Sequence, residues 1–317
     1  MKSVKSNDKK VCTPISIGGQ AVIEGVMMNG PEKMATAVRK SDGEIVMDIK
    51  EKNSFISKYK LNKIPILRGF LSFFVSMFTG VSCLMFSAKQ CDLEENGEQM
   101  SKFEKWVMEK FGDKIFDVVM YISVAFSLVI GIGLFMVLPK LIVEWVSIPF
   151  GGINEGVSTL IEGIIRMVIF LSYIILISQM KDIRRVFEYH GAEHKTIFAY
   201  EYGEELTVEN VKKQKRFHPR CGTSFLVLVM IISVIVFLCI SAFAGNMNLT
   251  EKVLWRIATL PLIAGISYEC IKLAGRCDNA FTRIISAPGV WLQKFTTREP
   301  DESQIEVAIA AFNAVVP

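Results

Sequence analysis

Four long apolar runs constrain this chain more than any other feature. Each has the length of a helix that crosses a lipid bilayer, which takes about 20 apolar residues at about 1.5 Å per residue. The chain is 51% hydrophobic over 317 residues, with a mean hydropathy of +0.36, which is too apolar for a soluble protein of this size. The sequence therefore predicts a mainly α-helical, polytopic membrane protein, with the lipid bilayer as a necessary partner. The four runs are Phe116–Leu138, Ser158–Ser178, Thr223–Phe243 and Lys252–Ile271.

A fifth run, Ile64–Ser87, is long enough to cross but has an unusual composition. Small or polar residues recur in it every three or four positions, which places them on one face of a helix. Such a face suits packing against another helix, and it also suits a helix that lies in the membrane interface. The residues of this stripe are Arg68, Ser72, Ser76, Thr79, Cys83 and Ser87.

The distribution of lysine and arginine decides between these alternatives. If Ile64–Ser87 crosses the membrane, the connecting segments place 13 positive residues on one side and 19 on the other. If it does not cross, one side holds 31 and the other holds only Lys140. Because cytosolic loops carry the excess of positive charge, the second arrangement is favoured. We predict about four transmembrane helices in the cell membrane, both termini in the cytosol, and an interfacial or re-entrant helix at 64–87.

The soluble segments are predicted from turn signals and polar composition. The first 14 residues are charged and lack the apolar core of a signal peptide. Ile15–Met28 has the composition of a strand broken by Gly18-Gly19 and Gly25, and Asp42-Gly43 marks the tip of a hairpin between Thr36–Lys40 and Glu44–Ile49. Residues 1–63 are therefore expected to form a small β-rich cytosolic region.

The remaining boundaries follow from the apolar runs. The membrane domain covers 116–271, with a cytosolic loop at 179–222, and a cytosolic C-terminal region covers 272–317. Cys91–Asp113 is predicted to be a helical connector and Pro139–Val157 an outer loop. Ser303–Val315 is apolar at helical spacing, so we expect an amphipathic helix that docks on the domain or on the membrane surface.

All three histidines of the chain fall within the 179–222 loop. His190 and His194 are one helical turn apart and share a face, which is a common way to hold a transition metal. With Glu193 they form a His-x-x-Glu-His string, the inverted zincin pattern, in which the glutamate is the general base. The run Met180–Tyr200 is expected to be helical and to continue the second span. The alternative is a solvated histidine pair at a helix end.

His218 and Cys221 add two further metal-binding side chains just before the third span. Together with the histidine pair they could complete a tetrahedral site for a divalent transition metal, most simply zinc, or leave one position open. The alternative is a helix-capping loop with a buried thiol. Glu269, at the cytosolic end of the fourth span, is a further candidate ligand or base. It could equally pair with Lys272 or Arg276 at the head-group level.

Several other charges near the membrane need partners. Glu162 and Arg166 are spaced to form an ion pair on the second span, and a polar cavity facing the outer leaflet is the alternative. Glu24 and Arg68 have no evident partner in the sequence, and each is a candidate to face the metal site.

The motifs together resemble the YqhQ-like family of bacterial membrane proteins. The resemblance covers nearly the whole chain and rests on the segments Gly18–Met28, Leu67–Gly69, Tyr189–Lys195, His218–Phe225 and Thr296–Pro300. The family is of unknown function and is commonly labelled a predicted metal-dependent enzyme, a label that rests on the same kinds of residue. The resemblance implies that its motif positions here are Glu24, His190, Glu193, His194, His218 and Cys221.

These observations support two main functions. One is a metal-dependent hydrolase at the cytosolic face of the membrane, with Glu193 as general base. The other is a non-catalytic scaffold or interaction protein whose metal is structural. A metal carrier or sensor is less favoured, because ionisable residues do not line the middle of several spans. The sequence shows no phosphate-binding loop, nucleotide fingerprint or nucleic-acid-binding module, so we expect no nucleic-acid partner, and the substrate stays open.

Overall fold

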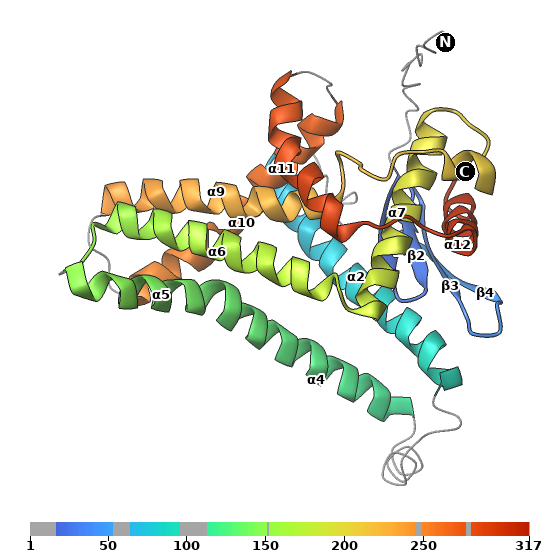
Figure 1. The fold of residues 1–317 in the computed structure, drawn as a ribbon, viewed down its shortest axis with the longest axis horizontal. Helices are drawn as coiled ribbons and strands as arrows, with labels where there is room; N and C mark the ends of the chain where they lie inside the picture. The colour runs from blue at the N-terminus through green and yellow to red at the C-terminus, as the bar shows by residue number, and fades with distance from the viewer. Residues whose placement is uncertain are drawn as a thin grey trace.

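The protein is an elongated helical bundle with a small sheet-containing domain at one end (Figure 1). The computed structural model describes residues 17–52, 64–95, 113–150, 152–244, 249–276 and 280–316. The first 14 residues and most of the predicted connector at 91–113 lie outside the described residues. The prediction of a mainly α-helical polytopic membrane protein with a small β-rich domain is confirmed.

The sheet has four antiparallel strands in the order β1-β2-β3-β4. The hairpin predicted around Asp42-Gly43 is confirmed, and Gly43 has a φ of +90° at its tip. The stretch predicted as a strand broken at Gly18-Gly19 and Gly25 is a second hairpin, which turns at Ile23 and Glu24, just before Gly25. Glu24, the second residue of this turn, takes a φ of +50°, which composition alone did not reveal. The strands are β1 (Gly18–Val22), β2 (Gly25–Asn29), β3 (Lys33–Arg39) and β4 (Ile45–Glu51).

Two helices pack on this sheet, α7 (Lys181–Glu201) and α12 (Glu302–Asn313), and the short helix α8 (Val208–Lys212) packs on both of them to complete the domain. Their shared core is apolar and fully buried, with Met28, Tyr189, Ile305 and Phe312 among its largest side chains. The predicted C-terminal amphipathic helix is confirmed, and α12 docks on the domain. Its start is fixed by Asp301, which caps the backbone of Gln304 in a capping box.

Five helices are long and apolar enough to cross a membrane. They are the four predicted spans, with adjusted ends, together with α2. Figure 1 shows α6, α9 and α10 side by side along the long axis of the molecule. The bundle helices are α2 (Leu67–Glu95), α4 (Asp113–Ile132), α5 (Leu138–Ser147), α6 (Glu155–Ile177), α9 (Gly222–Ala244), α10 (Leu249–Arg276) and α11 (Ala280–Thr296).

The first predicted span is longer than expected, and the loop predicted at Pro139–Val157 is largely helical. A π-helical turn, η2 (Gly133–Val137), joins α4 to α5, and a short 3-10 turn, η3 (Ile148–Phe150), follows α5. Pro139 lies in the first turn of α5 and has no N–H to donate to the carbonyl of Phe135, four residues earlier. That carbonyl instead accepts a hydrogen bond of 2.8 Å from Arg166 Nε. A proline inside a helical run therefore does not end it here.

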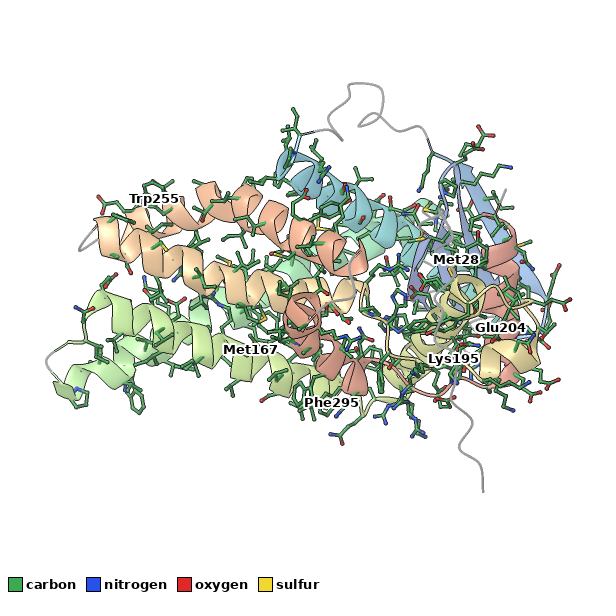
Figure 2. The ribbon with its side chains drawn as sticks, turned by 90° about the horizontal axis from the view of Figure 1, so that it is seen from above. Met28, Met167, Lys195, Glu204, Trp255 and Phe295 are labelled. Carbon is green, nitrogen blue, oxygen red and sulfur yellow. The ribbon has the colours of Figure 1, made fainter. Side chains whose placement is uncertain are left out.

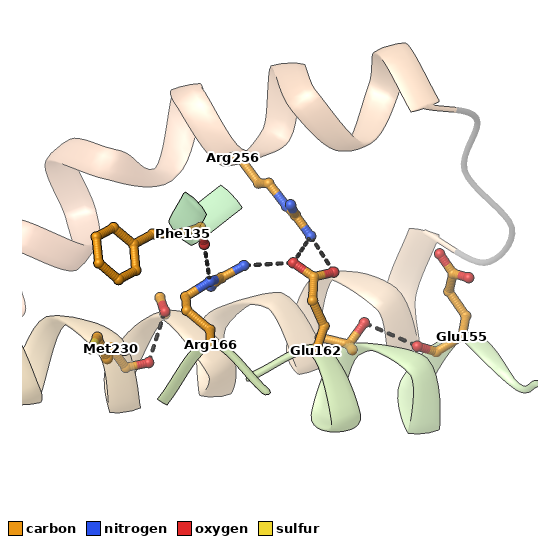
Figure 3. Close-up of polar contacts among 8 residues, drawn as sticks. Phe135, Glu155, Glu162, Arg166, Met230 and Arg256 are labelled. Carbon is orange, nitrogen blue, oxygen red and sulfur yellow. Dashed lines mark hydrogen bonds and ion pairs between the residues drawn. The ribbon is translucent and has the colours of Figure 1, made fainter. Parts of the chain in front are cut away.

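A cluster of three charged side chains connects α6 to α10 (Figure 3). The predicted pair of Glu162 and Arg166 forms, and Arg256, which was not predicted, donates to both carboxylate oxygens of Glu162 at 2.7 Å. Glu162 is buried, with 7% of its surface exposed. A pocket of about 240 Å³ adjoins Glu162 and Arg256, so the ion pair and the polar cavity occur together.

The second predicted span does not continue straight into the histidine helix. The backbone leaves the α-helix at Ser178, and α7 begins anew at Lys181. Helix α7 then runs in the domain, where Lys195 lies, whereas Trp255 lies at the far end of the bundle (Figure 2). The break turns the histidine helix away from α6 and against the sheet.

Candidate metal centre

Helix α7 places His190 and His194 one turn apart at the junction of the domain and the bundle. Their ring centroids are 4.4 Å apart. Between them, Gly191 lets the segment after α11 lie directly against the helix. A Cβ atom at this position would lie 2.0 Å from the Arg298 carbonyl oxygen. The glycine that weakens the helical pattern in the sequence is therefore required by packing.

Backbone carbonyls fix the orientation of both histidine rings. His190 Nδ1 lies 2.8 Å from the Thr296 oxygen, and His194 Nδ1 makes a short contact with the Arg216 oxygen. A carbonyl oxygen can only accept, so each Nδ1 carries the proton, and each neutral ring keeps a lone pair on Nε2. Histidines that bind metals are held in this way by a bond from their other ring nitrogen.

Cys221 completes a group of three donor atoms. One atom each from His190, His194 and Cys221 lies within 4.8 Å of the others, and His190 Nε2 is 3.1 Å from the sulfur. Two ligands on one tetrahedral zinc lie roughly 3.6 Å apart, from bond lengths near 2.1 and 2.3 Å. The group therefore has the composition and nearly the spacing of a transition-metal site.

The electrostatics of this group favour metal-binding protonation states. Burial lowers the pKa of His194, which keeps its ring neutral. Burial alone would raise the pKa of the Cys221 thiol, but the facing His194 and the hydroxyl and N–H of Thr223 lower it overall. A neutral imidazole and a thiolate are the forms that bind metal. Within the described part of the chain, His194 Nε2 is buried and makes no hydrogen bond of normal geometry. The Cys221 side chain lies close enough to interact with the His194 ring electrostatically.

Glu193 lies beside the three donors without belonging to the group. It is buried, and burial is the main reason that its pKa rises to about 8, with Cys221 adding to the shift and His190 opposing it. Its carboxyl group accepts a hydrogen bond from the Gly19 N–H of β1. A Cβ at Gly19 would lie 2.8 Å from Glu193 Cγ, so only glycine lets the strand approach this closely.

His218 lies next to the group of three donors but has other contacts. Its ring centroid is 5.6 Å from that of His194. Its Nδ1 accepts a bond of 3.3 Å from the Arg220 N–H, and its Nε2 is 3.6 Å from the carboxylate of Glu201, which also pairs with Arg220. Glu201 was not found from the sequence, because nothing near it in the chain marks its position. Arg220 was also not identified from the sequence, where only its position between His218 and Cys221 pointed to a role near the site.

The other three predicted site residues are held by partners elsewhere. Arg68 Nε lies 2.6 Å from Glu269 Oε1, and a second nitrogen of Arg68 binds Oε2. Arg68 was not considered as a partner of Glu269 in the sequence, whereas Lys272, which was considered, also interacts with Glu269 electrostatically. Glu24 binds Arg185 and accepts a bond of 3.2 Å from the Tyr189 hydroxyl, so it has a partner after all. The structure does not bring Glu24, Arg68 or Glu269 into the group of three donors.

Comparison with known proteins agrees with the resemblance seen in the sequence. Residues 64–317 match the family described as a protein of unknown function, DUF1385. The chain belongs to this family. It is also 34% identical over 312 residues to the uncharacterized protein YqhQ of Bacillus subtilis (strain 168), covering 96% of this chain and 93% of that protein. No solved structure matches the chain.

The extent of the DUF1385 match bears on the site. It includes the three donors and Glu193, but it begins after the sheet, so Gly19 and Glu24 fall outside it. The similarity to YqhQ covers almost the whole chain and therefore extends over most of the sheet. Neither relative carries an assigned activity in its description.

Proposed function

We propose that this protein is a metal-dependent hydrolase of the cell membrane, with its site at the cytosolic face. The observation that carries the proposal is the pair of histidines whose Nδ1 atoms are held by carbonyls, which leaves both Nε2 lone pairs near Cys221. Glu193 lies beside these donors as a buried carboxyl group. The excess of lysine and arginine in the segments at the domain end supports a cytosolic location for that end.

The residues divide into ligands and a proton carrier. His190, His194 and Cys221 would hold a divalent transition metal, and the nitrogen and sulfur donors favour zinc. A metal bound there would act as a Lewis acid and lower the pKa of water. In hydrolysis, water supplies a hydroxyl group to the acyl or phosphoryl fragment and a proton to the leaving alcohol.

Glu193 is placed to move that proton. It is adjacent to His194 in the chain, and the Gly19 N–H fixes its carboxyl group. A carboxyl group whose pKa is near 8 can both take up and return a proton close to neutral pH. His218 would act next to the ligands, where it lies against Glu201, and it would not be a ligand itself.

The competing function is a structural metal in a membrane scaffold. It is favoured by the way the site joins three segments: α7, the loop that ends at Cys221, and the end of α11. Gln293 of α11 also bonds both the N–H and the carbonyl of His218, which ties the same segments without a metal. A metal could therefore stabilise an arrangement of segments that hydrogen bonds already hold together.

Replacing Glu193 by glutamine separates the two functions. Glutamine keeps the shape and the hydrogen bond but cannot take a proton, so Glu193→Gln should retain metal and protein level and lose complementation of a deletion strain. The exposed Glu205 offers a matched control, and Glu205→Gln should complement fully. Full complementation by Glu193→Gln at normal abundance would end the hydrolase proposal and leave the structural metal.

A further inference from the structure

Helix α2 begins inside the bundle and ends on the sheet. At its start, Ile66 and Gly69 lie against Gly265 and Tyr268 of α10. Gly265 is eight residues before Leu273, where the apolar part of α10 ends, so at about 1.5 Å per residue it lies about 12 Å inside that segment.

The other end of α2 reaches the domain. Cys83 is buried and accepts a hydrogen bond of 3.3 Å from the Thr36 hydroxyl of β3. One turn earlier, Gly80 lies against the side chain of Gln20 in β1. The helix therefore leaves the bundle on the side of the sheet, where β4, the preceding element of the chain, also lies.

The backbone before α2 has the geometry of a sharp turn. Ile66 has a φ of +67°, which is rare for a β-branched residue and strains the backbone. The contact with Gly265 and the ion pair of Arg68 with Glu269 hold this turn in place. The described elements on both sides of this turn, β4 before it and the later part of α2 after it, lie at the sheet, which is the arrangement expected of a re-entrant segment.

Two helices flank the start of α9, where Cys221 lies, and both expose apolar side chains. On α2, Phe73 packs against Phe225 of α9 with centroids 5.4 Å apart, while Phe74, Val75 and Phe78 are exposed. The exposed fraction of Phe78 is 68%, which fits contact with acyl chains and not with water.

On α11, Gly289 packs directly against Ser224 of α9. Its opposite face exposes Ile284 and Trp291, and Arg283 and Lys294 lie at the two ends of this stripe. An apolar stripe that contains a tryptophan and ends in basic residues is typical of a helix at the membrane surface near anionic head groups.

The candidate metal centre contacts α11 directly and is connected to α2 through strand β1. The last residue of α11, Thr296, supplies the carbonyl that orients His190. Gly19 of β1 touches Glu193, and the next residue, Gln20, touches α2. The donors therefore lie at the level of the bilayer surface, one strand away from the re-entrant helix.

We infer that the substrate of the proposed hydrolase is an anionic amphiphile of the cytosolic leaflet. Its head group would reach the three donors and Glu193, and its apolar chain would remain in the leaflet along α2 and α11. The inference rests on the proposed function for the reaction, but the binding of an amphiphile is tested separately.

The test uses the full-length Glu193→Gln protein in vesicles of equal amounts of phosphatidylethanolamine and phosphatidylglycerol. A small fraction of the phosphatidylglycerol carries a diazirine in its head group. After illumination, mass spectrometry locates the adducts. We expect head-group adducts on peptides that contain His190 to His194 or Cys221. Phe78→Ser should reduce this labelling about tenfold, the loss expected for one aromatic contact with the chain.

Phe126 provides the matched control, because it is a phenylalanine of α4 with 65% of its surface exposed. Phe126→Ser should leave the labelling at the donors unchanged. Absent labelling at the donors, or an equal effect of both variants, overturns the inference. Metal content and complementation by Glu193→Gln are measured on the same protein. A metal-loaded protein that needs Glu193 but shows no labelling keeps the hydrolase and loses the lipid substrate.

Discussion

Replacing Gly191 by alanine is the sharpest test of how the site is held together. In an unobstructed helix this change stabilises a protein by about 0.5–1 kcal/mol, because alanine restricts the unfolded chain and favours the helix. Here the new Cβ would lie 2.0 Å from the Arg298 carbonyl oxygen, and ordinary contact begins near 3.4 Å. The segment that follows α11 must therefore move by about 1.4 Å.

That movement would break contacts on both sides of the clash. The Arg298 N–H donates to the Phe187 carbonyl at 2.8 Å, and the Thr296 carbonyl accepts from His190 at 2.8 Å. Each such bond contributes about 0.5–1.5 kcal/mol, so losing both outweighs the helix gain and leaves a net loss of about 1–2 kcal/mol. Freeing the ring of His190 should also weaken metal binding by about 10–100-fold.

The assay is thermal unfolding of the purified protein in detergent, with metal content measured on the same samples. Gly131→Ala serves as the control, because Gly131 lies near the end of α4, where the helix continues into η2, and a Cβ there meets nothing within 4 Å. We expect Gly131→Ala to keep or slightly raise the midpoint, and Gly191→Ala to lower it and lose metal. Equal midpoints and equal metal content in the two variants would refute the steric reasoning.

Three further predictions test the metal, the topology and the pH dependence. The double variant His190→Ala/His194→Ala should lose the zinc that the wild type retains on purification, and unchanged metal content would contradict the site. On a cysteine-free background, a cysteine at Asn154 should react with an impermeant reagent added outside cells and one at Asn210 should not, and the reverse pattern would exclude the four-span topology. The pKa of buried His194 is below its ordinary value of 6.5, so the unfolded chain takes up a proton first. The metal-free protein should therefore lose stability as pH falls below about 6.5, until the folded pKa is reached. Melting curves at several pH values should show this loss in the wild type and a smaller one in His194→Gln.

The parts of the fold that local patterns specify could be predicted from the sequence. Apolar runs located the spans, and Asp42-Gly43 located one hairpin, because its glycine provides the positive φ that the turn needs. The other hairpin was missed, since Glu24 takes a positive φ without being a residue that favours it. The prediction of a loop after the first span was wrong. Pro139 directly follows the π-helical turn η2, in the first turn of α5, and the helix continues through it.

The candidate site, too, could be predicted only where a local pattern of the sequence determines the arrangement. His190 and His194 share a helix face, and helical geometry alone predicts their proximity. The pairing of Arg68 with Glu269 joins residues 201 positions apart, and that of Lys195 with Glu299 joins residues 104 apart. No local pattern encodes such distances. The sequence therefore indicated the donors, and Lys272 as a neighbour of Glu269, but it did not indicate Arg68 as the partner of Glu269.

The charged cluster of α6 and α10 favours one order in which the two helices are inserted into the membrane. The chain is synthesised from its N-terminus, so Glu162 and Arg166 enter the membrane together, as a pair that is neutral overall. Arg256 follows 94 residues later and finds Glu162 already in the bilayer. An arginine inserted alone costs about 2.5–3.5 kcal/mol at the centre of a span, and less near the end of a span, where Arg256 lies in α10. A rearranged gene that placed α10 ahead of α6 would encode the same contacts and yet bring Arg256 to the translocon with no acidic partner in place.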